Sequence, residues 1–253
     1  MNIPIITYHA VGDGPRPLWL SAREFNSHLE AFSRCGHRSL RLSELDEVLN
    51  GTKPAPSNAI VLTFDDGYRN FHSHAWPSLS RWGFAATVFL ISDYCGHDNG
   101  WPTQSKQTPR EPLLSWAQVN ELSRQGCDFG AHSRTHAPLT LLSENEIRRE
   151  VCESAERIRQ ETGQDVETFA YPYGAVNRAV TSTVRRAFKV AVGTRLGFAN
   201  SGSDLFLLPR IDAYYLSPVS IERLSTPAFR AYLALRQGIR GTRGLVSKPW
   251  AQS

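Results

Sequence analysis

The sequence contains few cysteines, little net charge and no long apolar run. Of its 253 residues, four are cysteine and one is methionine. The cysteines are not spaced as CxxC pairs, which argues against a zinc knuckle or a thioredoxin-like motif. No window approaches the roughly 18 consecutive apolar residues that a membrane-spanning helix needs. We expect all four cysteines to be reduced and mostly buried, namely Cys35, Cys95, Cys127 and Cys152.

The net charge is too small to indicate nucleic-acid binding. The chain has 28 Lys and Arg residues against 24 Asp and Glu residues, a net charge of +4. The basic excess lies late, because residues 227–253 contain no acid. They carry five cations: Arg230, Arg236, Arg240, Arg243 and Lys248. A solvated tail would account for this pattern, and the alternative is a patch that contacts anionic lipid or an acidic partner.

The composition and the N-terminus indicate an ordinary globular protein. Hydrophobic residues make up 41% and charged residues 21%, which excludes disorder, collagen and coiled coil. The first residues lack a basic segment and reach polar positions too early for a signal peptide, so they are typical of a first strand. We therefore expect a cytoplasmic protein, with the inner face of the membrane as an alternative location.

Short apolar runs alternate with helical patterns along the chain. Strands are expected at residues 3–8, 59–64, 85–91, 127–131, 167–171, 189–194 and 206–211. Helices are expected at residues 22–35, 43–49, 71–82, 115–125, 143–161 and 176–188. This alternation predicts an α/β fold with a mostly parallel sheet, and the length favours an irregular (β/α) barrel of about seven strands over an open sheet.

Local signals add detail to this scheme. Ser21 with Glu24 three residues later forms a capping-box pattern, and Ser43 is expected to cap the second helix. Residues 93–112 are rich in Gly, Pro, Asn and Thr, which predicts a long loop, and loops of this length are usually functional or disordered. We expect residues 1–215 to form the barrel and residues 216–253 to form a C-terminal helix and basic tail.

Polar residues gather where the expected strands end. In a (β/α) barrel the chemistry lies at the carboxyl ends of the strands. The residues at those ends that are suited to chemistry are His9, Asp65, Asp66, His132, His136 and Tyr173.

Asp65 and Asp66 follow an apolar strand directly, and Gly67 allows a sharp turn after them. Burying charge is unfavourable, so such a pair needs solvent, a basic partner or a cation. Taken alone, this segment is better explained as a turn in which the carboxylates cap backbone N–H groups.

His132 and His136 lie four residues apart, so their imidazoles can converge on one ion if the segment makes a helical turn. Taken alone, they could equally be surface histidines. Two histidines with one carboxylate, however, supply three ligands and leave coordination positions open, as in catalytic zinc or related divalent sites. One of the two carboxylates would then be left to act as a base.

These motifs resemble the polysaccharide deacetylase domain, carbohydrate esterase family four. The segment TFDDGY at residues 63–68 is similar to the first family motif, HSRTH at 132–136 to the second and FAYPYG at 169–174 to the third. Residues 114–130 are also similar, and the resemblance covers roughly residues 1–215. It implies a deacetylase-type barrel.

The resemblance also implies roles for matching residues. Asp65 would be the general base, and the backbone N–H of Tyr173 would help to hold the oxyanion. Asp66, His132 and His136 would bind one divalent metal, with Zn²⁺ expected and Co²⁺ or Ni²⁺ as alternatives.

The chain departs from the family pattern at two places. Ala170 stands where the third motif usually carries an arginine, so Arg210 is our candidate to orient Asp65. No histidine follows His136, whereas the usual late motif supplies a catalytic one. One branch of the family has permuted motifs with that histidine near the N-terminus, which makes His9 the candidate general acid.

Two aromatic residues are further candidates at the substrate site. Trp101 could provide a stacking wall for a sugar, and Tyr68 could line the pocket.

The function that this resemblance implies is metal-dependent removal of an N-acetyl group from an acetamido sugar, a glycan or a glycan precursor. The alternatives are hydrolysis of an amide or imide in a small non-sugar molecule, O-deacetylation, and carbohydrate binding by a non-catalytic domain. An acetylated sugar or glycan is the expected partner, and nucleic acid is not. For the basic tail, the membrane surface or a glycan-assembly partner is the alternative to solvent.

Overall fold

The computed structural model describes the backbone of residues 1–244 and the side chains of residues 1–240. Lys248 of the predicted basic tail, and the side chain of Arg243, lie outside the described part.

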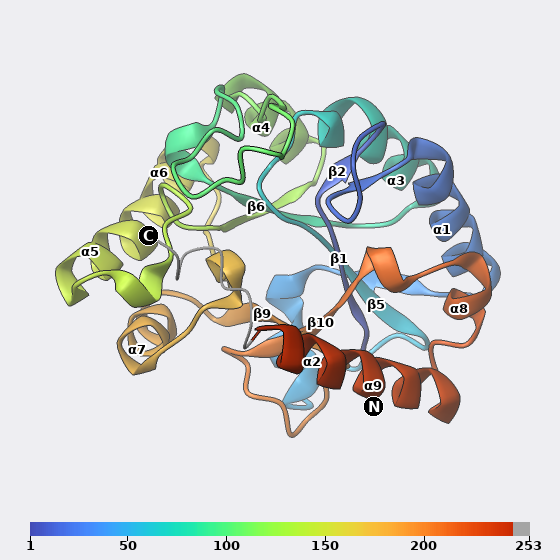
Figure 1. Cartoon of the computed structure of the whole chain (residues 1–253). Coiled ribbons are helices and arrows are strands. Elements are labelled where there is room, and N and C mark those ends of the chain that lie inside the picture. Colours follow the sequence, from blue (N-terminus) through green and yellow to red (C-terminus); the bar gives the residue numbers. More distant parts are fainter. Residues whose placement is uncertain (245–253) are drawn as a thin grey trace.

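Seven parallel strands close into a barrel (Figure 1). They are β1 (Ile5–Tyr8), β5 (Ala59–Phe64), β6 (Thr87–Leu90), β7 (Asp128–Ala131), β8 (Thr168–Ala170), β9 (Val190–Leu196) and β10 (Leu208–Asp212). The ring is closed by pairing of β1 with β5 on one side and with β10 on the other. The predicted irregular barrel of about seven strands is therefore confirmed.

An eighth strand of this sheet, β4 (Arg38–Leu40), was not expected from the sequence. It pairs with the first half of β5, whose second half pairs with β6. A separate two-stranded sheet, β2 (Ala10–Val11) with β3 (Trp19–Leu20), was also not expected.

Helices surround the ring (Figure 1). They are α1 (Ala22–Arg34), α2 (Leu45–Leu49), α3 (Trp76–Trp82), α4 (Trp116–Arg124), α5 (Glu144–Arg148), α6 (Ser154–Thr162), α7 (Arg178–Ala187), α8 (Pro218–Glu222) and α9 (Pro227–Gly244). Two of the expected helices contain a π-helical turn, at Phe71–Ala75 before α3 and at Arg149–Glu153 between α5 and α6. None of the described helices combines the length and apolar character that crossing a membrane requires.

The helix caps were only partly predicted. Ser21 and Glu24 form the expected capping box at α1. Ser43 does not cap the second helix, because a 3₁₀ turn at Leu42–Glu44 precedes α2, and the Glu44 carboxylate accepts the backbone N–H of Arg41 instead.

Alternation along the strands separates two apolar layers. On β5, Ile60, Leu62 and Phe64 pack with the helices, whereas Ala59 and Val61 point into the barrel. The interior is filled at its amino end by apolar side chains: Ile5, Val61, Phe89, Val190, Val192 and Leu208. The same inward-facing rows become polar toward the carboxyl end, which places the candidate site there.

The C-terminal helix packs on the barrel. Phe229 and Leu233 of α9 belong to the same buried cluster as the inner faces of the other helices. The helix runs beside β9 (Figure 1) and contacts that strand.

Candidate active site

The polar ends of the inward-facing rows form one cavity. On β1 the row runs from Ile5 through Thr7 to His9, and on β5 it runs from Val61 through Thr63 to Asp65. This cavity is lined by polar residues from distant parts of the chain, namely Thr7, His9, Asp65, Asp66, His132, His136, Tyr173 and Arg210. The structure therefore brings together residues that are more than 200 positions apart in the sequence.

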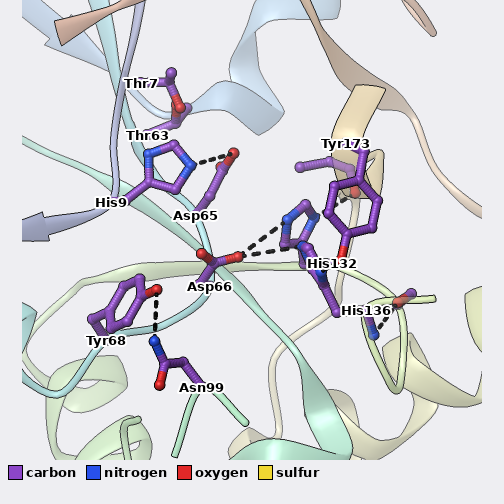
Figure 2. Close-up of polar contacts among 12 residues, drawn as sticks. Thr7, His9, Thr63, Asp65, Asp66, Tyr68, Asn99, His132, His136 and Tyr173 are labelled. Atoms are coloured by element: carbon purple, nitrogen blue, oxygen red, sulfur yellow. Dashed lines mark hydrogen bonds and ion pairs between the residues drawn. The ribbon is translucent and has the colours of Figure 1, made fainter. Parts of the chain in front are cut away.

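Asp66, His132 and His136 converge at the floor of the cavity (Figure 2). The Nε2 atom of each histidine lies 3.5 Å from Oδ1 of Asp66. One ligand atom from each residue lies within 4.8 Å of the others, which forms a candidate metal site. Two imidazoles and one carboxylate are the donor set of an open divalent site, so the residues fit the expected cation.

Neighbouring groups fix the orientation of both histidines. Nδ1 of His132 lies 2.7 Å from the carbonyl oxygen of Ala170, and donation of its proton there leaves Nε2 as the ligand atom. Nδ1 of His136 lies 2.8 Å from the Tyr173 hydroxyl. The His136 ring also lies between Trp101 and Tyr173, with both ring centroids 4.5 Å away.

Burial and charge act in opposite directions on the pKa values of these groups. Burial lowers the pKa of His136 to about 3, so this imidazole is neutral, as ligation requires. Burial would raise the pKa of Asp66, but the contact with His132 and the nearby histidine charges hold it below its usual value. Burial would lower the pKa of His132, but the contact with Asp66 and the charge of Asp65 raise it.

The segment that carries both histidines is not the helical turn that the spacing suggested. Ser133 and His136 have φ values of 65° and 58°, in the left-handed region. The carboxylate of Glu150 accepts the backbone N–H groups of Arg134 and Thr135. Convergence of the histidines therefore depends on a loop that the neighbouring helix holds in place.

Asp65 is held apart from the candidate metal ligands by Arg210. The guanidinium forms two parallel hydrogen bonds of 2.7 Å to the two carboxylate oxygens of Asp65. It also donates to Oγ1 of Thr7 and to the carbonyl of Gly193. Burial would raise the pKa of Asp65, but the charge and hydrogen bonds of Arg210 hold it well below its usual range. Asp65 is thus a buried, oriented carboxylate.

His9 faces the other side of Asp65 (Figure 2), with its Nε2 atom 3.9 Å from Oδ2 of Asp65. Its side chain is 22% exposed, so it can meet a ligand that enters the cavity.

The turn after β8 places Tyr173 at the cavity wall. Tyr173 has a φ value of 59°. A Cβ atom on Gly174 would lie 2.1 Å from Oγ1 of Thr194, so only glycine allows the turn to approach β9 so closely.

The two aromatic candidates lie differently from what the sequence suggested. Tyr68 is 1% exposed, packs on Trp19 and accepts a hydrogen bond from Asn99, and it is not part of the described cavity lining. Trp101 does line the cavity, but it is 3% exposed and its ring packs at a tilt against that of His136, which leaves almost no face for a sugar.

Sequence reasoning missed several residues at this site. Thr103 contacts the Tyr173 hydroxyl and donates to the His136 carbonyl, and Gln104 lines the cavity. Both lie in the long loop at residues 93–112. The length of this loop was the feature of the sequence that indicated a functional role. Arg240 of α9 also lines the cavity, and only its positive charge marked it in the sequence.

Comparison with known families and curated proteins gives a consistent result. Residues 52–190 match the profile of the family described as Polysaccharide deacetylase. The Bacillus subtilis protein YxkH is 25% identical over 92% of this chain and 76% of its own length. The poly-beta-1,6-N-acetyl-D-glucosamine N-deacetylase of Escherichia coli K12 is 24% identical over 70% of this chain, which corresponds to 31% of that larger protein.

Solved structures support the fold. The Streptococcus pyogenes deacetylase PplD, in complex with acetate, superposes with a TM-score of 0.78 at 23% identity, over 90% of this chain and 99% of that one. IcaB from Ammonifex degensii superposes with a TM-score of 0.73 at 23% identity, over 88% of this chain and 95% of that one.

Proposed function

Because this chain belongs to the polysaccharide deacetylase family, we propose that it is a metal-dependent hydrolase that removes N-acetyl groups from an acetamido sugar or an N-acetylated glycan. The observation that carries the proposal is the separation of two adjacent carboxylates. Asp66 faces His132 and His136, whereas Asp65 is paired with Arg210 and does not belong to the ligand set. One carboxylate can therefore bind the cation while its neighbour acts as a base.

Asp66, His132 and His136 would hold the cation, with Zn²⁺ expected and Co²⁺ or Ni²⁺ as alternatives. A divalent cation bound there would supply Lewis-acid chemistry to the acyl carbonyl. Arg210 keeps Asp65 ionised and oriented, so the carboxylate can accept the proton of the attacking water. The Tyr173 backbone N–H would donate to the developing oxyanion.

His9 would complete the reaction at the leaving group. It lies across Asp65 at the partly open side of the cavity. In its protonated form, His9 would transfer a proton from Nε2 to the nitrogen of the departing amine. Without this proton, the amine would have to leave as an anion. General acid assistance of this kind typically contributes about 10²–10⁴-fold.

An acetamido sugar is favoured by the names of the relatives. The proteins of Escherichia coli and Staphylococcus aureus with which this chain aligns are named poly-beta-1,6-N-acetyl-D-glucosamine N-deacetylases. The alternatives are O-deacetylation, hydrolysis of a small non-sugar amide or imide, and carbohydrate binding without catalysis.

The deciding experiment measures acetate release by metal-loaded protein from N-acetylhexosamine oligomers, nucleotide-linked N-acetyl sugars, an O-acetylated sugar and a cyclic imide. We expect release from the N-acetyl sugars. Asp65→Asn and His9→Ala should retain the fold and the metal but lose most turnover, whereas His132→Ala should lose the metal.

His74→Ala is the matched control, because His74 is exposed and outside the cavity lining. A metal-loaded protein that releases acetate from none of these substrates would refute the proposal. If His9→Ala turned over substrate at the wild-type rate, only the assignment of His9 as the general acid would be refuted.

A further inference from the structure

The candidate active site adjoins a second cavity on the β9 side of the barrel. We call this the β9 cavity, and its lining includes Gly193, Thr194, Arg195, Asp204, Gln237 and Arg240. Gly193, Thr194 and Arg240 also line the active-site cavity. A substrate whose acyl group lies near Asp65 could therefore extend past Thr194 into the β9 cavity.

Two hydrogen bonds attach α9 to the end of β9. The side-chain oxygen of Gln237 accepts the backbone N–H of Leu196 at 2.8 Å. One turn further along the helix, Nη1 of Arg240 lies 3.5 Å from the carbonyl oxygen of Thr194. These contacts place the Arg240 guanidinium where the two cavities meet. The 3.5 Å contact is long, and within the described side chains most N–H donors of the Arg240 guanidinium have no partner.

The charge of the β9 cavity is unbalanced. Its acidic side chain, Asp204, is paired with Arg185. Within the described side chains, no carboxylate lies within ion-pair distance of Arg195 or Arg240. In the active-site cavity, by contrast, Arg210 is already bound to Asp65. Within the described side chains of the two cavities, the guanidinium groups without a carboxylate partner are therefore that of Arg195 in the β9 cavity and that of Arg240 at its junction with the active-site cavity.

Guanidinium groups with free N–H donors bind carboxylates and phosphates through paired, charge-assisted hydrogen bonds. Arg195, Gln237 and Arg240 all lie beyond residue 190, where the match to the family profile ends.

We propose that the β9 cavity is a subsite for an acidic group, a carboxylate or a phosphate, carried by the same N-acetylated substrate. Arg240 and Arg195 are its specificity residues. This inference rests on the proposed function for the chemistry at Asp65, but the binding that it predicts can be measured without turnover.

The test compares calorimetric binding of N-acetylglucosamine with that of N-acetylmuramic acid and N-acetylglucosamine 6-phosphate. We expect at least one acidic sugar to bind about tenfold more tightly than the neutral one, as for a hydrogen bond to a charged group. The preference should fall below about twofold in the Arg195→Gln/Arg240→Gln double variant. Arg195→Gln alone, which leaves the contact of Arg240 with Thr194 in place, should reduce the preference without changing the affinity for the neutral sugar or the Tm.

Arg81→Gln is the charge-matched control, because Arg81 is exposed on α3 and outside both cavity linings. The carboxylate and phosphate sugars show which acid the subsite takes. Equal affinity for neutral and acidic sugars, or a preference that survives in the double variant, would overturn the subsite. A lower Tm together with weaker binding of the neutral sugar would show that Arg240 only anchors α9. This result would also overturn the subsite.

Acetate release, measured in parallel, separates this proposal from the proposed function. Binding preference without release from any sugar would leave the subsite standing and refute the deacetylase. Release of acetate from neutral sugars, without tighter binding of the acidic sugars, would support the deacetylase and refute the subsite.

Discussion

At the scale of single residues, the pairing of Asp65 with Arg210 has the largest consequence for the site. Asp65 and Arg210 are 5% and 2% exposed, so neither charge is compensated by bulk water. Ala170 stands where the family's third motif usually carries an arginine, and the bidentate contact to Asp65 comes from Arg210. A different strand, β10, therefore supplies a guanidinium to Asp65.

Removing Arg210 should damage both stability and turnover. Arg210→Gln leaves a buried carboxylate without its partner, and such changes destabilise proteins by about 3–5 kcal/mol. We expect kcat/KM to fall at least ~10²-fold, because the base is no longer oriented. Arg210→Lys is the control that keeps the charge without the bidentate fork. Urea unfolding and acetate-release kinetics measure both effects, and unchanged turnover in Arg210→Gln would contradict the role.

Asp128 offers a prediction unrelated to catalysis. It lies at the amino end of β7, and its carboxylate accepts a hydrogen bond from Thr87 at 2.8 Å. Burial raises its pKa from 3.8 to about 6. Between these pH values the folded protein binds more protons than the unfolded chain, so the stabilising contribution of Asp128 is complete below pH 3.8 and is lost as pH rises through 6.

Asp128→Asn should therefore stabilise the protein at pH 7. The pKa shift corresponds to about 3 kcal/mol at most, and the stability difference should nearly disappear at about pH 2.5, where the carboxyl group is almost fully protonated in both states. Urea unfolding of both proteins at the two pH values measures the difference. If Asp128→Asn were less stable than the wild type at pH 7, the folded protein would favour the ionised form of Asp128.

At the scale of elements, the 132–136 loop shows how local strain is supported by its neighbours. Four of the five described non-glycine residues with positive φ lie at the site, namely Asp66, Ser133, His136 and Tyr173. Such conformations persist only where surrounding contacts hold them. Glu150, in the π-helical turn, accepts three hydrogen bonds from Arg134 and Thr135, and Ser154 donates to the Ser133 carbonyl.

Loss of the Glu150 contacts should weaken metal binding without touching a ligand. We expect Glu150→Ala to lower metal affinity by about 10–100-fold, the range typical of outer-shell partners. Glu153→Ala is the matched control, because Glu153 pairs with the half-buried side chain of Arg134 and, within the described residues, does not accept a hydrogen bond from the loop backbone. Zinc competition with a chelating dye measures both variants. Equal affinities in the wild type and Glu150→Ala would show that the loop holds its shape without this support.

At the scale of the whole molecule, the barrel has an apolar amino end and a charged carboxyl end. Two carboxylates, two imidazoles and one guanidinium are buried together at the carboxyl end. Desolvation of these groups opposes folding, and a bound cation would offset part of it by attracting both carboxylates.

Binding of the cation should therefore raise the Tm. At a free Zn²⁺ concentration 100 times Kd, mass action stabilises by about 2.7 kcal/mol. For a chain of this size, that corresponds to a rise of about 5–10 °C. Mg²⁺, which prefers oxygen ligands, should have a smaller effect. Scanning calorimetry of chelator-treated protein tests this, and an equal Zn²⁺ response in His132→Ala would place the ion elsewhere.

The sequence alone predicted the barrel fold. It also predicted that four side chains lie close together, namely those of Asp65, Asp66, His132 and His136. The reason is that strand alternation, capping and the polar ends of apolar runs are local patterns, and a closed parallel barrel brings all strand ends to one face. The roles of these residues and of His9 and Tyr173 stay predictions.

Only the tertiary structure decided the contacts between distant segments. The bidentate pairing of Arg210 with Asp65, the non-helical loop that orients His132 and His136, and the reach of Arg240 from α9 into the cavity are examples. No local window encodes these contacts, because they depend on which strands pair, how the ring closes and how tightly side chains from separate elements pack.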